Sequence, residues 1–330
     1  MTVVAFVLIA FMLLVYVLLD GYDLGVAAAT PLVARSDRER AASMAAIGPF
    51  WNGNEVWLIA AGGVLFALFP KAYASVFSGF YLPFIIVLWL LMFRGIAMEV
   101  RGHFPSAIWH EFWDTAFWLA SALLVVVFGV ALGNLLRGLP LDAAGYFRGT
   151  FAYLLNGYAL LVGFFALEVL VQHGLSFLIL RVDGALSERA RRLSGALWWV
   201  SLVAYVAVTA ATFIERGMAL TLSPLDMLPL FSLASLLAMK ACIASKRDAG
   251  AFIASCAFIA TLLIEAAATL FPYLLPARPL GQGGISIFDA QPGPVALVTA
   301  IVSTLAGLCA VIVYGSFAAR RMLGKLHVDE

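Results

Sequence analysis

Long apolar segments, each about the length needed to cross a lipid bilayer, follow one another along almost the whole of this 330-residue chain. A helix needs about 20 apolar residues to span the hydrocarbon layer. Charged residues make up only 12% of the sequence, whereas a soluble domain has about 25%. The sequence therefore predicts an all-α integral membrane protein, a single bundle over residues 1–330 with about nine spans, at residues 2–30, 54–69, 75–98, 114–136, 151–180, 195–214, 226–244, 249–271 and 294–318.

The positions of the basic residues indicate how this bundle is oriented. Most of the 20 Lys and Arg residues lie in the connections after the odd-numbered spans and in the C-terminal tail. Cytoplasmic loops carry such an excess, so we expect a periplasmic N-terminus and a cytoplasmic C-terminus. The first span has no basic residues before it and no small-residue cleavage site after it, which favours a retained helix over a signal peptide. The Pro- and Gly-rich connection at residues 271–294 is expected at the surface.

Several function classes lack their usual signals in this sequence. A net charge of +1 provides no field that would attract nucleic acid. The three cysteines lie in apolar segments without a pairing pattern, and only one of the four histidines, His173, lies in a span. There is no Walker motif, no Rossmann glycine motif and no metal-spaced His or Cys cluster. We therefore expect no nucleic-acid partner, no nucleotide or metal, and no haem bound by this chain.

Two acids lie deep in the first span, at Asp20 and Asp23. A helix that enters from outside at Thr2 reaches Asp20 after roughly 27 Å, near the cytoplasmic edge of the hydrocarbon. Three residues apart, the two acids share one helix face. They either mark the helix end at the interface or form an inward-facing proton-accepting or cation-binding group. The second interpretation is favoured because the apolar segment continues to Thr30.

The second span begins with a polar motif between Trp51 and Trp57, expected at the same depth. Tryptophan is common at membrane interfaces, but Glu55 is followed directly by apolar residues and Asn52 lies one turn before it. Arg94 arrives on the same side from the third span. Buried charges need partners, so we expect Asn52, Glu55 and Arg94 to join the two acids in one polar cluster, with Arg94 as the electrostatic partner.

Other polar residues inside the predicted spans are weaker candidates for a proton path. Glu168, Gln172 and His173 lie in the fifth span, where hydrogen bonds between helices explain them equally well. Glu265 stands alone in the eighth span, and Lys240 is expected to extend toward the interface.

Several short motifs closely resemble subunit II of the cytochrome bd quinol oxidases, a family that includes the cyanide-insensitive oxidases. The strongest matches lie at residues 20–25, 51–59, 61–67, 77–81 and 93–95, and sparser ones follow at residues 133–136, 173–174, 271–272 and 289–290. The resemblance implies a multi-pass protein of the bacterial inner membrane. Its partner would be a larger subunit I that carries haems b and d and the quinol site, with small accessory subunits, lipid and the quinol pool as further partners.

The same resemblance implies a role for particular residues. The complex oxidises quinol and reduces dioxygen to water with protons from the cytoplasm, and subunit II supplies a scaffold and a proton-uptake route without being catalytic alone. The family's second acid in the first motif corresponds to Asp23. Its acid in the Trp-x-Gly-Asn motif corresponds to Asn52, which cannot take up a proton. Either Glu55 replaces that acid, or the route runs from Asp23 through water ordered by Asn52.

Two alternatives remain at this point. Acids within spans also mark proton- or cation-coupled secondary transporters, which would be active as this chain alone and would bind their substrate near mid-membrane. The other alternative is a purely structural subunit, in which the polar cluster only fixes how the helices pack.

Overall fold

The computed structural model describes residues 1–217, 227–281, 283–322 and 324–326, most of which are helical. Helices and strands follow in the order α1 (Thr2–Val33), α2 (Asp37–Ile47), α3 (Trp51–Leu68), α4 (Pro70–Gly79), α5 (Tyr81–Val100), η1 (Arg101–His103), α6 (Ala107–Arg137), α7 (Phe151–Leu154), α8 (Gly157–Arg181), α9 (Gly184–Arg216), α10 (Leu228–Ala244), α11 (Asp248–Leu270), β1 (Tyr273–Pro276), β2 (Gly284–Ser286), α12 (Ile287–Ala290) and α13 (Pro294–Met322).

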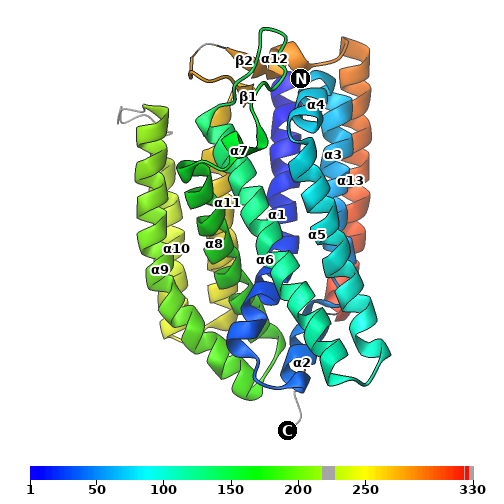
Figure 1. Cartoon of the computed structure of the whole chain (residues 1–330), viewed down its shortest axis with the longest axis vertical. Helices are drawn as coiled ribbons and strands as arrows, with labels where there is room; N and C mark the ends of the chain where they lie inside the picture. The colour runs from blue at the N-terminus through cyan, green and yellow to red at the C-terminus, as the bar shows by residue number, and fades with distance from the viewer. Residues whose placement is uncertain (218–226, 282, 323, 327–330) are drawn as a thin grey trace.

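The long helices run side by side along the longest axis of the molecule (Figure 1). Among the described residues, seven helices are long and apolar enough to cross a membrane: α1, α5 with η1, α6, α8, α9, α11 and α13. The fold is therefore that of an all-α membrane protein. Helices α3 and α10 run beside the other seven, but α3 starts with a polar turn and α10 has only 17 residues. A count of nine spans stays a prediction.

Helix α1 lies inside the bundle and packs against α3, α6, α8 and α11. Every residue from 20 to 30 is buried, so this part of α1 is covered on all sides. Glycines allow the closest approach: a Cβ atom added to Gly25 would lie 1.8 Å from the carbonyl oxygen of Leu170, and one added to Gly174 would lie 2.2 Å from the backbone of Gly25. The backbones of α1 and α8 thus touch directly.

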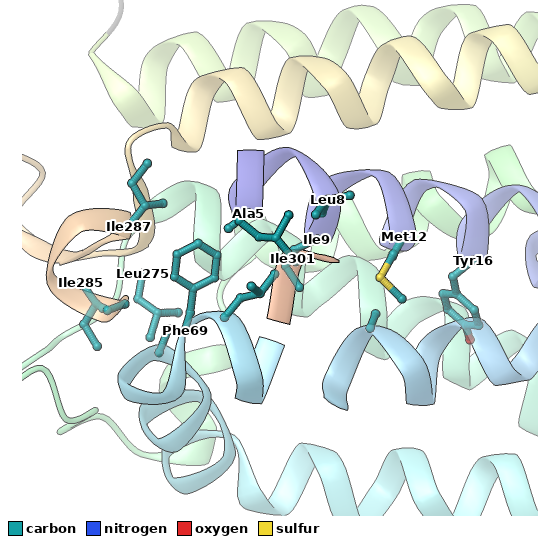
Figure 2. Close-up of a cluster of buried hydrophobic side chains, with 14 of the residues drawn as sticks. Ala5, Leu8, Ile9, Met12, Tyr16, Phe69, Leu275, Ile285, Ile287 and Ile301 are labelled. Atoms are coloured by element: carbon teal, nitrogen blue, oxygen red, sulfur yellow. The ribbon is translucent and has the colours of Figure 1, made fainter. Parts of the chain in front are cut away.

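A hydrophobic cluster closes the end of the bundle where the N-terminus lies. Figure 2 shows Ala5, Leu8 and Ile9 of α1 beside Phe69, which links α3 to α4. Residues from β1, β2, α12 and α13 complete the cluster, including Leu275, Ile285, Ile287 and Ile301. The first turns of α1 are therefore fixed by segments from the far end of the sequence.

Three local features differ from the expected elements or refine them. The expected span at residues 75–98 is divided, because α4 ends at Gly79 and α5 begins at Tyr81. A short helix that was not expected, α2, follows α1. The Pro- and Gly-rich connection lies at the end of the bundle as expected, but it folds into an antiparallel β1–β2 hairpin followed by α12 (Figure 1).

Ion pairs fasten the short elements at both ends. At the α2 end, Arg101 donates to Asp37 at 2.6 Å and to Asp114 at 2.5 Å. Glu39 pairs there with Arg189 of α9. Burial alone would raise the pKa of Glu39, but hydrogen bonds from the backbone N–H of Arg35 and from the Arg189 guanidinium hold the pKa below its usual value. At the opposite end, Glu215 accepts a hydrogen bond from Arg137 at 3.1 Å and pairs with Arg278.

Candidate functional site

A fully buried ion pair joins α1 to α5 inside the bundle. Arg94 donates from Nη1 to Asp20 Oδ2 at 2.9 Å and from Nη2 to Asp20 Oδ1 at 2.5 Å, and neither side chain is exposed. This two-point geometry is the strongest form of an arginine–carboxylate contact. A buried charge without a partner is very costly, so each member of the pair requires the other.

The second acid of α1, Asp23, lies in different surroundings. Asn54 of α3 donates from Nδ2 to Asp23 Oδ2 at 2.7 Å and to the hydroxyl of Tyr22 at 2.8 Å. Asp23 Oδ1 is buried and accepts no hydrogen bond from the described residues. Within the same residues Asp23 forms no ion pair, unlike Asp20. Asp23 is therefore a buried carboxyl group with one oxygen free to accept or carry a proton.

Glu55 and Asn52, the two polar residues of α3 that were expected in the cluster, lie in different surroundings. Glu55 is half-buried and within electrostatic reach of Arg94 and Asp20, so it lies at the edge of the cluster. Asn52 is exposed and is not brought into the cluster. Asn54 is buried in its place. Helix geometry explains the difference, because two residues correspond to about 200° of rotation.

Asn54 is the residue that the sequence reasoning missed. The buried positions of α3 are Asn54, Trp57, Ala61 and Leu68, spaced by three, four and seven residues. This spacing marks the face of a helix that packs against its neighbours. The apolar members of that face were readable in the sequence, and extending the face back by one turn from Trp57 leads to Asn54.

His173 is fully buried between α1, α8 and α11. Its Nε2 lies 3.0 Å from the carbonyl oxygen of Leu18, and its Nδ1 lies 2.7 Å from the hydroxyl of Ser255. A carbonyl oxygen can only accept, so Nε2 carries a proton. The imidazole ring also stacks on Phe252, with 5.1 Å between ring centroids. Both ring nitrogens are thus engaged by the protein itself.

The two remaining acids lie at other helix interfaces, outside the cluster around Asp20 and Asp23. Glu168 of α8 accepts a hydrogen bond from Ser201 of α9 at 2.6 Å. Glu265 of α11 accepts one from Ser232 of α10. Lys240 lies over the rings of two tryptophans, with its Nζ 4.9 Å and 5.0 Å from the ring centroids of Trp198 and Trp199.

Two further features bear on what the bundle can bind. A cavity of about 710 Å³ lies among α1, α5, α6, α8, α9 and α11, lined largely by apolar side chains such as Phe128 and Phe165. Such a lining suits a hydrocarbon chain. Within the described ranges, no group of three or more His, Cys, Asp or Glu residues is arranged to hold a metal ion.

Comparisons with known proteins cover nearly the whole chain. The model of the family described as cytochrome bd terminal oxidase subunit II matches residues 1–322. A probable cytochrome oxidase subunit 2 of Haemophilus influenzae is 29% identical, over 98% of this chain and 94% of that protein. The cytochrome bd-I ubiquinol oxidase subunit 2 of Escherichia coli K12 is 28% identical with the same coverage.

Two further matches are a relative with higher identity over a shorter stretch and a chain of a solved structure. The cytochrome bd ubiquinol oxidase subunit 2 of Bacillus subtilis is 38% identical, over 64% of this chain and 63% of that protein. A chain in the structure of bd oxidase from Geobacillus thermodenitrificans has a TM-score of 0.76 and 18% identity, over 98% of both chains. At that identity the structural match establishes the fold alone.

Proposed function

Because this chain belongs to the family of cytochrome bd terminal oxidase subunits II, we propose that it is the haem-free subunit of a quinol:dioxygen oxidoreductase and contributes a cytoplasmic proton-uptake route. It is a multi-pass protein of the bacterial inner membrane and part of a quinol oxidase complex. The partner in this proposal is a subunit I that holds haems b and d. The present chain would then support catalysis without being catalytic alone.

The proposed route enters at Asp23. The observation that carries this assignment is the position of Asp23, which lies ten residues before the end of α1 with one carboxyl oxygen held by Asn54 and the other free. A group that passes protons on must be able to gain and lose one, and the carboxyl oxygen of Asp23 without a hydrogen-bond partner is the atom that can do so. The Asp20–Arg94 pair provides a fixed dipole beside it, and Glu55 is the next acid toward the surface of the chain.

The exposed side of α3 supports contact with a partner at this depth. Asn52 is exposed and Glu55 half-buried, while their neighbours Val56 and Ile59 expose apolar surface. Polar groups that face lipid are costly. We therefore place subunit I over this face, where it would cover both side chains and receive protons from them. Small accessory subunits and membrane lipid would cover other apolar faces.

The proposal also includes topology. We infer a single domain over residues 1–330 with nine spans, α3 and α10 being the two that join the seven long apolar helices. The basic residues favour a periplasmic N-terminus and a cytoplasmic C-terminus. In this orientation Asp23 lies in the cytoplasmic part of the membrane, as uptake from that side requires.

The proton role is tested by the double substitution Asp23→Asn and Glu55→Gln in the assembled complex. We expect oxygen consumption to fall by roughly tenfold or more, because neither replacement can take up a proton, while haem content stays normal. Glu111→Gln, which changes an exposed carboxyl group in the first turns of α6, serves as the control and should leave turnover unchanged. Wild-type turnover in the double variant would exclude the proton role.

The two alternatives predict different outcomes, one in this experiment and one in purification of the chain alone. A purely structural subunit predicts fewer assembled complexes, each with normal turnover. A secondary transporter predicts activity from this chain purified alone. The family match supports an oxidase subunit and lends no support to the transporter. A chain that copurifies with a haem-bearing partner, seen by its absorbance, would agree with the proposal.

A further inference from the structure

A second row of polar side chains follows one face of α8, apart from the cluster around Asp23. Glu168, Gln172 and Ser176 are spaced by four residues and so lie on the same face, one turn after another. Two serines of α9, seven residues apart, face this row. Ser201 donates to Glu168 Oε1 at 2.6 Å, and Gln172 Nε2 donates to Ser194 Oγ at 2.9 Å.

Two oxygens of this row are buried and accept no hydrogen bond from the described residues. They are Oε2 of Glu168 and Oε1 of Gln172, a side chain that is only 3% exposed. Buried polar atoms are normally hydrogen-bonded, and an exception calls for a partner such as an ordered water. One water has two protons to donate. Placed between these oxygens, it would donate to Gln172 Oε1 and accept from the Glu168 carboxyl group when that group is protonated, or donate to both oxygens when it is ionised.

A small cavity lies at the Ser176 end of the row. It has a volume of about 10 Å³ and is lined by Ser176, Ser194, Arg191 and Asp248, with apolar side chains around them. This volume is close to the least that holds a single water, which also needs two to four polar partners. Arg191 provides one directly, because its Nε is buried and donates to none of the described residues.

The cavity is closed toward the surface by the pair between Arg191 of α9 and Asp248 of α11. Both side chains are partly exposed, at 18% and 25%, so this end of the row meets the surrounding solution. The opposite end lies deep in the bundle. Glu168 is 11 residues from the start of α8 and 13 from its end, about 17 Å and 20 Å along the helix.

Three ionisable groups inside the neighbouring helices have other partners, and Glu188 of α9, an exposed side chain, lies 3.9 Å from Arg191 Nε on the outer side. His173 of α8 is hydrogen-bonded to Leu18 and Ser255. Lys240 of α10 lies over the rings of Trp198 and Trp199. Glu265 of α11 binds Ser232. Among the residues that the structure describes, Glu168 is therefore the one carboxyl group within the row, and Arg191 and Asp248 are the charged pair at its mouth.

We propose that Glu168 holds an exchangeable proton at mid-membrane, connected to solution by two water sites, one in the cavity beside Arg191 and one between Glu168 and Gln172, with the Ser194 hydroxyl between them. The step is proton exchange alone: the carboxyl O–H breaks as an O–H of water forms, and no electron moves. That the mouth opens to the cytoplasm rests on the proposed orientation, whereas the exchange itself does not.

The test is infrared spectroscopy of the purified oxidase complex transferred from H₂O to D₂O. The carboxyl band of Glu168 is identified by its loss in Glu168→Gln, and its shift in D₂O gives the exchange rate. Ala251→Val adds two methyl groups at the wall of the cavity, and we expect it to slow this exchange by about tenfold. Ala257→Val, on an exposed face of the same helix, is the matched control and should exchange at the wild-type rate.

A second variant keeps the test decisive if Ala251→Val does not assemble. Ser194→Ala removes the hydroxyl between the two water sites without adding volume, and we expect it to slow exchange as well. The proposal is wrong if Glu168→Gln removes no carboxyl band, or if exchange in the assembled variants matches the wild type. Since neither readout depends on oxygen consumption, this inference and the role of Asp23 can fail separately.

Discussion

At the scale of single residues, the two acids of α1 lie three positions apart but have different partners. Asp20 is held at both oxygens by Arg94, whereas Asp23 is held at one oxygen by the amide of Asn54. A charge with a fixed counter-charge is suited to holding a structure together, and a carboxyl group with a free oxygen is suited to exchange. The two acids differ because Asp20 faces Arg94 of α5, whereas Asp23 faces Asn54 of α3.

Asn54 is predicted to matter more for stability than Asn52, although both lie in the same motif. Asn54→Leu removes the donor to Asp23 and Tyr22 and leaves polar groups buried without partners. That should cost about 1–3 kcal/mol. Asn52→Leu changes an exposed side chain and should stay within about 0.5 kcal/mol. Thermal unfolding of the purified complexes compares the two, and equal effects would contradict the assignment of Asn54.

The sequence was sufficient to find Asp20, Asp23, Glu55 and Arg94 as polar residues in apolar surroundings. It was not sufficient to pair them. Asn52 and Asn54 lie about 200° apart around α3, so only one can face α1. The family motif pointed to Asn52, whereas the buried face through Trp57 and Ala61 leads to Asn54. The pairing of Arg94 with Asp20 rather than Asp23 depends in turn on where α5 lies against α1.

At the scale of helices, the contact between α1 and α8 depends on glycine. Gly25 and Gly174 bring the two backbones so close that a methyl group on either would overlap main-chain atoms of the other helix. Main-chain atoms cannot rotate away as a side chain can. The interface that carries Asp20 and Asp23 on one helix and His173 on the other therefore has little tolerance for added volume.

Gly174→Ala is predicted to weaken the bundle. The added Cβ would force α1 and α8 apart, at a cost of about 1–3 kcal/mol or more. Gly307→Ala in α13 is the control, because a Cβ there meets no atom within 4 Å. It should be neutral or stabilising, as alanine favours helix by about 1 kcal/mol. The yield and melting temperature of the complex measure both, and similar values for the two variants would argue against the close contact.

The existence of the long helices was predictable from their apolar length, but the shorter elements were not identified. Helix α2 is capped by Ser36, whose hydroxyl accepts from the backbone N–H of Glu39 at 3.2 Å, a recognisable N-terminal pattern. The break between α4 and α5 at Phe80 and the β1–β2 hairpin have weaker local signals. Both depend on packing against the cluster around Phe69, which brings together segments distant in the sequence.

At the scale of the whole molecule, the two ends of the bundle are fastened by separate sets of ion pairs. One set joins α2, α6 and α9 through Asp37, Asp114 and Glu39, and the other joins α6 and α9 to the β1–β2 segment through Glu215. In the proposed topology, which follows the distribution of basic residues, the first end lies in the cytoplasm. The assignment decides from which side protons would reach Asp23.

Cysteine labelling checks this orientation. In a chain whose Cys242, Cys256 and Cys309 are replaced by alanine, Ala143→Cys adds a thiol to the exposed connection after α6, and Ser106→Cys adds one to the exposed connection before it. A maleimide that cannot cross membranes should label the first variant on intact cells with a permeable outer membrane. The second should be labelled only after the inner membrane is broken. The reverse pattern would invert the topology.

The burial of residues 20–30 on every side of α1 has a consequence for how the protein is made. Asn54 follows Asp23 by 31 residues and Arg94 follows Asp20 by 74, and the backbone that packs on Gly25 lies in α8, near residue 170. During biogenesis, the two acids of α1 are therefore made before the residues that bind them, and the helix backbone that covers Gly25 is made later still.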